Sequence, residues 1–265
     1  MMAASVVKEK VANGGPKDRQ YVTALARGLK ILRCFNHDRR ELSPQEIVRL
    51  TGLPQPTVWR LCHTLHREGF IQCSVENGRM MLGLPALALG YAAHVQQALP
   101  EVALPYMRAL TERHRLGISL AVRDGLQMLY LQRTHGDFIY FNDPVGARRP
   151  LALAPTGWAC LSTYDDAERS EVLQALKRQM PTKWSDTLSR LERARQDYRK
   201  HGCILSIGIL HGQLNAVAVP IRSVKSGRVY GLSAAGLATE WPKKQLLAVG
   251  AELTELARDL AVVAD

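Results

Sequence analysis

Apolar side chains recur at helical spacing in two short stretches between Ser43 and Glu68. The first helix is predicted to begin at Ser43, because Glu46 three residues later completes a capping box, and Pro44 suits the first helical position. It is predicted to end at Gly52, a residue that accepts the left-handed conformation. The second helix is predicted over residues 55–68. The inward positions are Ile47, Val48 and Leu50 in the first helix, and Val58, Leu61, Cys62 and Leu65 in the second.

A short hairpin is predicted after the second helix. Residues 70–73 and 79–82 alternate as two strands, and Glu76-Asn77-Gly78 between them is a strong turn sequence. Two helices joined by a tight turn and followed by a hairpin indicate a winged helix-turn-helix, whose second helix enters the DNA major groove. A small helical bundle with a solvated charged face is the alternative. The outward side chains of the second helix are Gln55, Pro56, Trp59, Arg60 and His63.

The chain divides into four parts. Residues 1–20 are small and charged, and we expect a flexible tail. Residues 21–83 form the winged helix-turn-helix and include a preceding helix over 21–35, with Leu25, Leu29 and Leu32 on one side. Residues 84–98 are expected to form a linker helix that also contacts a second subunit, or else an ordinary buried helix. Residues 99–265 form the second domain.

The second domain alternates between helical and strand patterns. The mixture of hairpins and helices predicts an α+β fold with a mainly antiparallel sheet flanked by helices. Helices are expected over 104–115, 156–162, 165–177, 187–200 and 246–263. Strands are expected over 117–122, 126–132, 138–142, 214–221 and 228–235.

Composition supports a DNA-binding protein in the cytoplasm. Lys and Arg number 35 against 24 Asp and Glu among 265 residues, and residues 1–90 carry 13 basic against 7 acidic side chains. A basic domain attracts a polyanion by releasing counterions. The five cysteines are scattered without a CxxC pair, which fits a reducing compartment rather than a disulfide framework or a zinc site. No signal peptide or membrane-spanning stretch is apparent, so we expect no membrane partner.

The chain resembles the IclR-type bacterial transcriptional regulators along nearly its whole length. In the first domain the similar stretches are LARGLKIL at 25–32, TGLPQPTVWRL at 51–61, EGF at 68–70 and RMMLG at 79–83. In the second domain they are residues 146–161, 201–202, NAVAVP at 215–220 and GLS at 231–233. The N-terminal match is specific, and the C-terminal match is looser but keeps the family's order.

The resemblance implies a winged-helix domain, a linker helix and an effector-binding domain related to the GAF/PAS fold. It also implies a dimer or dimer of dimers that represses or activates transcription from a palindromic operator. By that similarity Arg27, Thr57, Arg60 and Arg79 contact DNA. Arg60 has the reach for a guanine edge or a phosphate, and Thr57 suits a phosphate. The outward positions of Gln55 and Trp59 add them to the predicted DNA-binding residues.

Several residues depart from the family pattern. Pro56 stands where a small polar residue is usual, and Trp59 is bulkier than is usual there. In the effector region Ala152, Ala154, Pro155 and Trp158 replace residues that are often polar or basic. The class of ligand therefore does not follow from the resemblance.

An effector pocket is predicted around the start of the helix at 156–162. Free N–H groups at a helix start bind anions, so Ala154, Thr156 and Gly157 are expected to face a carboxylate. Ser206, Asn215 and Ser233 would add polar groups by their place in the family pattern. Met128 and Tyr130 would supply apolar walls. Such a site suits a small organic acid, aromatic or aliphatic, with no cofactor or metal; ordinary sheet packing is the alternative for each residue.

The competing class is a hydrolase or other small-molecule enzyme, with the winged helix as an interaction module. Residues 231–235 (GLSAA) nearly spell a nucleophile elbow, but Ala235 stands at the second glycine position. His63 and His66 lie one turn apart, yet no Cys or carboxylate nearby completes a metal site. Neither a Walker loop nor a GxGxxG fingerprint is present. The sequence therefore predicts a regulator without catalytic residues.

Overall fold

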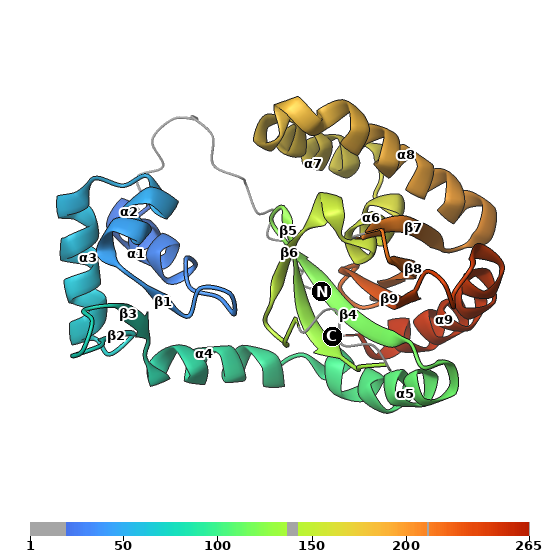
Figure 1. Ribbon diagram of the computed structural model, residues 1–265, viewed down its shortest axis with the longest axis horizontal. Helices are drawn as coiled ribbons and strands as arrows, with labels where there is room; N and C mark the ends of the chain where they lie inside the picture. The colour runs from blue at the N-terminus through green and yellow to red at the C-terminus, as the bar shows by residue number, and fades with distance from the viewer. Residues whose placement is uncertain (1–19, 137–142, 211, 265) are drawn as a thin grey trace, which may run out of the picture. The chain divides into compact units, whose positions relative to one another are not determined.

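The computed structural model describes residues 20–136, 143–210 and 212–264, and the chain divides into two compact units, Met1–Ala88 and Leu89–Asp265 (Figure 1). Each unit has its own hydrophobic core, as expected for two ordinary domains. The division falls inside helix α4 (Leu84–Val95). The strand expected over 138–142 lies outside the described residues.

Three helices pack together in the N-terminal unit: α1 (Thr23–Leu32), α2 (Pro44–Thr51) and α3 (Gln55–Arg67). The capping box at the start of α2 is present, because the Glu46 N–H donates to Ser43 Oγ at 3.3 Å and the Ser43 N–H donates to Glu46 Oε2 at 2.7 Å. Gly52 ends α2 with a φ of 66°. Lys30 of α1 donates to the Thr51 carbonyl at 2.6 Å, which satisfies one of the free acceptors at that helix end. The predicted turn between α2 and α3 is confirmed.

A three-stranded antiparallel sheet in the order β1-β3-β2 completes this unit. The hairpin consists of β2 (Ile71–Cys73) and β3 (Met80–Leu82), and Gly78 adopts a φ of 65° in the turn that joins them. Strand β1 (Glu41–Leu42) was not predicted; two residues are too few to show an alternating pattern. The winged helix-turn-helix is therefore present as expected.

Helices α1 and α4 leave apolar side chains in contact with solvent. On α1, Gly28 and Ile31 are buried, whereas Leu25 and Leu29 are exposed. Leu50 of α2 was expected to face inward but is 39% exposed, because Ile47 and Thr51 occupy the buried side of that short helix. No residue of α4 is buried, so the alternative of a buried core helix is wrong. Its exposed large apolar residues are Leu84, Leu87, Leu89, Tyr91 and Val95.

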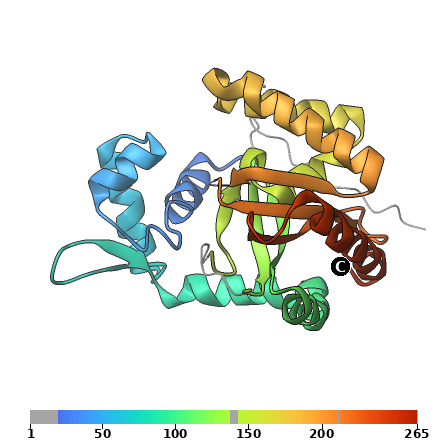
Figure 2. The same ribbon diagram turned by 45° about the vertical axis from the view of Figure 1, so that its right-hand side comes forward.

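The C-terminal unit is built on one antiparallel sheet of six strands in the order β6-β5-β4-β9-β8-β7 (Figure 2). Strands β4, β5, β8 and β9 match the expected positions, whereas β6 and β7 were not predicted. The strands are β4 (Gly117–Asp124), β5 (Gln127–Arg133), β6 (Arg148–Pro150), β7 (Ile204–Leu210), β8 (Leu214–Arg222) and β9 (Val229–Leu237).

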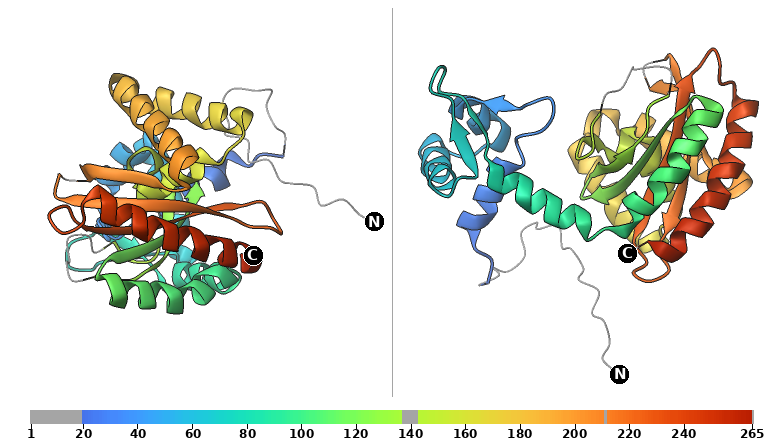
Figure 3. Two further views of the ribbon diagram at one scale, coloured as in Figure 1. Left: turned by 90° about the vertical axis from the view of Figure 1, so that its right-hand side faces the viewer. Right: turned by 90° about the horizontal axis from the view of Figure 1, so that it is seen from below.

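Helices cover both faces of this sheet (Figure 3). Helices α5 (Ala98–His114) and α9 (Lys243–Val263) cover one face. The other face is covered by α6 (Pro155–Ser162), which lies directly on β8 and β9, and by α7 (Asp166–Gln179) and α8 (Trp184–His201) beyond it. Short 3₁₀ turns precede α6 at Leu151–Leu153 and α8 at Pro181–Lys183. The predicted α+β class is confirmed.

The two faces of the sheet follow the alternation of side chains along each strand. Ile118 and Leu120 of β4 point to the α5 and α9 side, whereas Ala121 packs on the α6 side. The register pairs Ser119 with Arg133 of β5 on one flank and with Ser233 of β9 on the other. These three side chains therefore share the face that carries α6. In the described part of the chain, no helix is long and apolar enough to cross a membrane.

Candidate functional sites

The outward face of α3 is formed by the side chains that the helical spacing predicted. Val58 and Cys62 are buried in the core of the N-terminal unit, which fixes the orientation of the helix. Trp59 is half exposed. The exposed side chains of this face are Gln55, Pro56, Trp59, Arg60 and His63.

Two other predicted DNA-binding residues lie nearby in the same unit. Thr57, in the first turn of α3, is half-buried, and Arg27 of α1 is exposed. Within the part of the chain that the structure describes, neither the Arg60 nor the Arg27 side chain forms a hydrogen bond or an ion pair. Both guanidinium groups are therefore available to an anion, and the long side chains give them reach.

Arg79 has a different environment, because it pairs with acidic residues of its own unit. Its Nη2 atom lies 2.7 Å from Glu46 Oε2 and donates to the Glu41 carbonyl at 2.9 Å. The Ser43 backbone N–H, together with Arg79, holds the pKa of the Glu46 carboxyl below its ordinary value. Arg79 thus links the hairpin to the start of α2. A phosphate would have to compete with two acidic side chains and a carbonyl for the Arg79 guanidinium.

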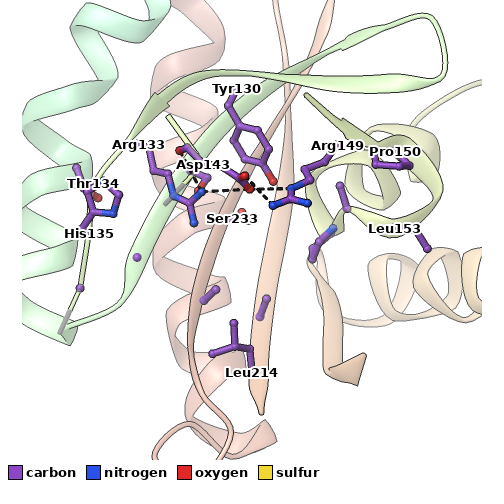
Figure 4. Close-up of a pocket in the computed structure, with 17 residues that line it drawn as sticks. Tyr130, Arg133, Thr134, His135, Asp143, Arg149, Pro150, Leu153, Leu214 and Ser233 are labelled. Carbon is purple, nitrogen blue, oxygen red and sulfur yellow. Dashed lines mark hydrogen bonds and ion pairs between the residues drawn. The ribbon is translucent and has the colours of Figure 1, made fainter. Parts of the chain in front are cut away.

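A cavity of about 160 Å³ opens on the α6 face of the C-terminal sheet (Figure 4). Its walls come from β4, β5, β6, β8, β9 and the start of α6. One end is ionic and the other is apolar, with Leu214 lying away from the charged groups in Figure 4. The residues that line it include Ser119, Tyr130, Arg133, Asp143, Arg149, Leu153, Ala154, Leu214, Ala216, Ser233 and Ala235.

Two arginines and one aspartate make the ionic end. Arg149 holds the buried Asp143 carboxylate in a two-pronged pair, with Nε to Oδ2 at 2.8 Å and Nη2 to Oδ1 at 2.7 Å (Figure 4). Arg133 approaches the same residue less closely: its Nη1 donates to the Asp143 carbonyl at 3.3 Å and lies 3.6 Å from Oδ2. The Nε of Arg133 is buried, and no described residue forms a hydrogen bond with it. The cavity therefore contains an incompletely paired cation.

Tyr130 stands beside these charges. Figure 4 shows its ring pointing toward the Asp143–Arg149 pair, and the Arg133 guanidinium lies 5.7 Å from the ring centre. Burial raises the pKa of the Tyr130 phenol, which Arg133 partly offsets. The phenol therefore stays protonated near neutral pH. A protonated phenol can donate a hydrogen bond to a ligand oxygen.

Three of the eight residues predicted for the effector pocket line this cavity: Tyr130, Ala154 and Ser233. The first turn of α6 offers fewer free donors than the sequence suggested. Pro155 has no N–H, and the Gly157 N–H donates to the Ala154 carbonyl at 2.9 Å. The positively charged groups of the cavity wall are thus the arginine side chains rather than the helix start.

The other five residues do not line the cavity, for reasons that the sheet register explains. Asn215 points to the opposite face of β8, where it accepts from the Gly208 N–H at 2.8 Å and donates to the Trp241 carbonyl at 3.0 Å. Met128 is fully buried in the core beneath α6. The remaining three, Thr156, Gly157 and Ser206, are also buried away from it.

Arg133, Asp143 and Arg149 were missed by sequence reasoning. Asp143 lies before residues 144–147 and Arg149 lies after them. Their pairing therefore depends on how β6 folds back on β5. One sequence signal was available. The Arg148-Arg149 pair directly precedes the apolar run 150–155, an unusual position for two adjacent cations.

The position of Ser233 and the burial of the cysteines do not suit a catalytic nucleophile. Ser233 lies in the middle of β9, whereas a nucleophile elbow requires a sharp turn between a strand and a helix. Burial raises the pKa of the Cys160 thiol to about 12 and that of Cys203 to about 11, so neither is a ready nucleophile. Among the residues that the structure describes, no cluster of His, Cys, Asp and Glu could hold a metal ion.

Comparison with known proteins identifies the family. The model of the IclR helix-turn-helix domain matches residues 24–73, and that of the bacterial transcriptional regulator IclR C-terminal domain matches residues 91–262. The chain therefore belongs to the IclR family of DNA-binding transcriptional regulators. Since both family models and the relatives described below are regulators, the hydrolase alternative has no support.

Two curated relatives are similar over most of the chain. The HTH-type transcriptional regulator TsaQ1/TsaQ2 of Comamonas testosteroni is 30% identical over 243 residues, which cover 90% of this chain and 87% of that protein. The Pca regulon regulatory protein of Pseudomonas putida is 30% identical over 219 residues, which cover 80% and 73% respectively.

Solved structures show the same fold. The crystal structure of an IclR family transcriptional regulator from Brucella abortus matches with a TM-score of 0.87 at 35% identity and covers 96% of this chain and 97% of that one. An IclR homologue from Microbacterium hydrocarbonoxydans, complexed with 4-hydroxybenzoate, matches with a TM-score of 0.69 at 26% identity and covers 90% and 99%.

Proposed function

We propose that this regulator acts in the cytoplasm as a dimer, or a dimer of dimers, on a palindromic operator, and that a small organic acid bound in the C-terminal cavity changes its affinity for that operator. The observation that carries the proposal is the cavity itself, in which an incompletely paired arginine stands at one end and an apolar wall at the other.

The face of α3 is proposed to read the DNA. Arg60 and Gln55 are suited to base edges in the major groove, because both carry donors on side chains with the necessary reach. Thr57 and Arg27 are proposed to hold phosphates, and Trp59 to contact sugar or a thymine methyl. For Arg79 we propose an indirect role, since its ion pair with Glu46 fixes the hairpin beside α2.

Self-association is supported by the apolar surfaces of α1 and α4. Monomeric soluble proteins rarely expose contiguous apolar patches of this kind. Along α4, exposed apolar residues recur at positions 84, 87, 91 and 95. Spacings of three and four residues make one continuous stripe on a helix, which fits the seam between two packed helices.

The effector is proposed to be an organic acid of benzoate size. Arg133 and Ser233 lie on the same face of the sheet, in the row that runs across β5, β4 and β9, and both line the cavity. A carboxylate at Arg133 would leave the body of the ligand against Leu214 and Ala216. The 4-hydroxybenzoate complex of the homologue supports an acid of this class.

Coupling requires that the ligand bind one arrangement of the protein more tightly than another. The cavity borders the start of α6 and the strands that α6 covers, so an occupying acid contacts several elements of the C-terminal unit at once. We propose that it thereby favours one assembly, and with it one separation of the two α3 helices on DNA.

The test selects genomic fragments with the purified protein, footprints the bound site and repeats the footprint with 4-hydroxybenzoate. We expect two protected half-sites related by two-fold symmetry, about 34–36 Å or a multiple apart, and a change in protection when the acid is added. The Ser233→Leu variant fills the cavity floor, so it should keep the footprint and lose the response to the acid.

The matched control is Ser170→Leu, which makes the same substitution on the exposed surface of α7 and should respond as the wild type does. A footprint without two-fold symmetry would contradict the proposed assembly. If neither 4-hydroxybenzoate nor a panel of related monocarboxylates altered the footprint or the Tm of the wild type, the proposed effector would be wrong.

A further inference from the structure

We propose that Asp143 sets the charge of the effector, so that the cavity accepts acids with one negative charge and discriminates against acids with two. The inference rests on the proposed function, because it assumes that the cavity binds an organic acid. It assigns to Asp143 the role of a specificity-determining residue.

The argument begins with the charges in the cavity wall. Apart from His135, the charged groups among the described lining residues are the cations Arg133 and Arg149 and the anion Asp143, so the arginines carry one positive charge more than Asp143 compensates. A buried charge without a partner is costly, and a ligand that supplies the missing charge recovers that cost. One carboxylate therefore makes the cavity neutral.

The geometry shows which cation is left over. Asp143 uses both carboxylate oxygens on Arg149, at 2.7 and 2.8 Å. Arg133 donates to the Asp143 carbonyl at 3.3 Å and lies 3.6 Å from one carboxylate oxygen, while its Nε has no hydrogen-bond partner among the described residues. With only 15% of its side chain exposed, Arg133 also has little access to water. Arg133 is therefore the group to which a ligand carboxylate binds.

Among the described lining residues, a second carboxylate on the ligand would find no further arginine or lysine. The lining opposite the ionic end includes Leu214, Ala216 and Ala235, which cannot solvate a charge. A second negative group near the ionic end would be repelled by Asp143. Because Asp143 is largely buried, this repulsion is only partly screened by water, and we expect a preference of about tenfold for the singly charged acid.

The experiment measures affinity for pairs of acids that match in size and differ in charge. Terephthalate is compared with 4-carbamoylbenzoate, and succinate with succinamate, by isothermal titration calorimetry at pH 8, where imidazole side chains are neutral. For the wild type we expect the singly charged member of at least one pair to bind at least about tenfold more tightly. Asp143→Asn removes the carboxylate and keeps both arginines, so the cavity is more positive by one charge and the preference should fall by about tenfold or reverse.

Two further variants separate charge from structure. The double variant Asp143→Asn with Arg149→Gln restores a single net positive charge, so it should regain the wild-type preference even if Asp143→Asn is less stable. The control Asp124→Asn removes the partner of Arg148, an ion pair of 2.6 Å outside the cavity on the same sheet, and should leave the preference unchanged.

Each outcome is decisive. Binding by the wild type with the same preference in Asp143→Asn would overturn the role of Asp143 while leaving the effector cavity intact. So would a double variant that behaves unlike the wild type although it binds acids. If the wild type bound none of the four probes and no other carboxylate, both the proposed effector and this inference would fail together.

Discussion

Two arginines of the N-terminal unit show how a residue's partners decide its role. Arg60 is exposed on α3 and has no partner among the described residues, whereas Arg79 is held by Glu46 and the Glu41 carbonyl. Bidentate recognition of a guanine requires a guanidinium that is free to turn toward the base edge. The difference between the two residues is therefore one of availability rather than of charge.

We predict that Arg60→Ala lowers specific operator affinity by about 10- to 100-fold and affects random DNA much less, because one good base contact contributes about 1–3 kcal/mol of discrimination. The measurement is a mobility-shift titration on the selected operator and on a scrambled duplex. Arg67→Ala, at the other end of α3, is the control and should weaken both duplexes alike. Equal losses on both duplexes for Arg60→Ala would remove this residue from sequence recognition.

How far the sequence predicted these residues depended on the distance to their partners along the chain. The outward face of α3 follows from spacing within thirteen residues, and all five expected side chains are exposed. The partner of Arg79 lies 33 residues away, and Asn215 bonds to Trp241 26 residues away. Spacing within one element carries no information about such contacts, so neither partner could be predicted from the sequence.

At the scale of elements, the close packing of α6 on β9 positions one wall of the cavity. Gly231 of β9 makes this packing possible. A Cβ at that position would lie 2.7 Å from Thr156 Cβ and would also collide with the Thr156 carbonyl oxygen. Because Ala154 and Pro155 precede Thr156 directly and line the cavity, the height of α6 above the sheet sets the position of that wall.

We predict that Gly231→Ala lowers the free energy of unfolding of the C-terminal unit by about 1–3 kcal/mol, the usual cost of forcing an extra carbon into a packed core. Thermal unfolding followed by circular dichroism measures it. Gly90→Ala, in α4, is the control: nothing lies within 4 Å of its added Cβ, so replacing a helical glycine should stabilise by about 0.5–1 kcal/mol. An unchanged Tm for Gly231→Ala would show that α6 can move away from β9 without a loss of stability.

The strands that sequence reasoning found and missed differ in a physical way. Strands β4, β5, β8 and β9 are seven to nine residues long, with buried apolar positions throughout. Strand β6 has three residues, two of them arginines, and β7 is interrupted by Gly208, near which the register with β8 shifts. Both lie at the edges of the sheet, and both bear on the prediction of the site. The missed β6 carries Arg149, and the missed β7 carries Ser206, which was expected in a loop beside the pocket.

At the scale of the molecule, the proposed palindromic operator would need two copies of α3, so the proposed function depends on assembly. Helix α4 has no buried residue within the chain. Leu87 and Tyr91, one turn apart, are 70% and 68% exposed and belong to its apolar stripe. Exposing that stripe to water is unfavourable by about 25 cal/mol for each Å² of apolar surface, and a second copy would remove it from water.

We predict that Leu87→Glu combined with Tyr91→Glu shifts the protein toward monomers and weakens operator binding, because four like charges would face one another in the seam of the dimer. Sedimentation velocity at several concentrations measures the assembly, and mobility shift measures the operator affinity. Val75→Glu is the control, since Val75 is fully exposed on the hairpin and is not part of α4, so this charge should leave the assembly unchanged. A double variant that kept the wild-type mass at micromolar concentration would mean that α4 does not form the dimer seam.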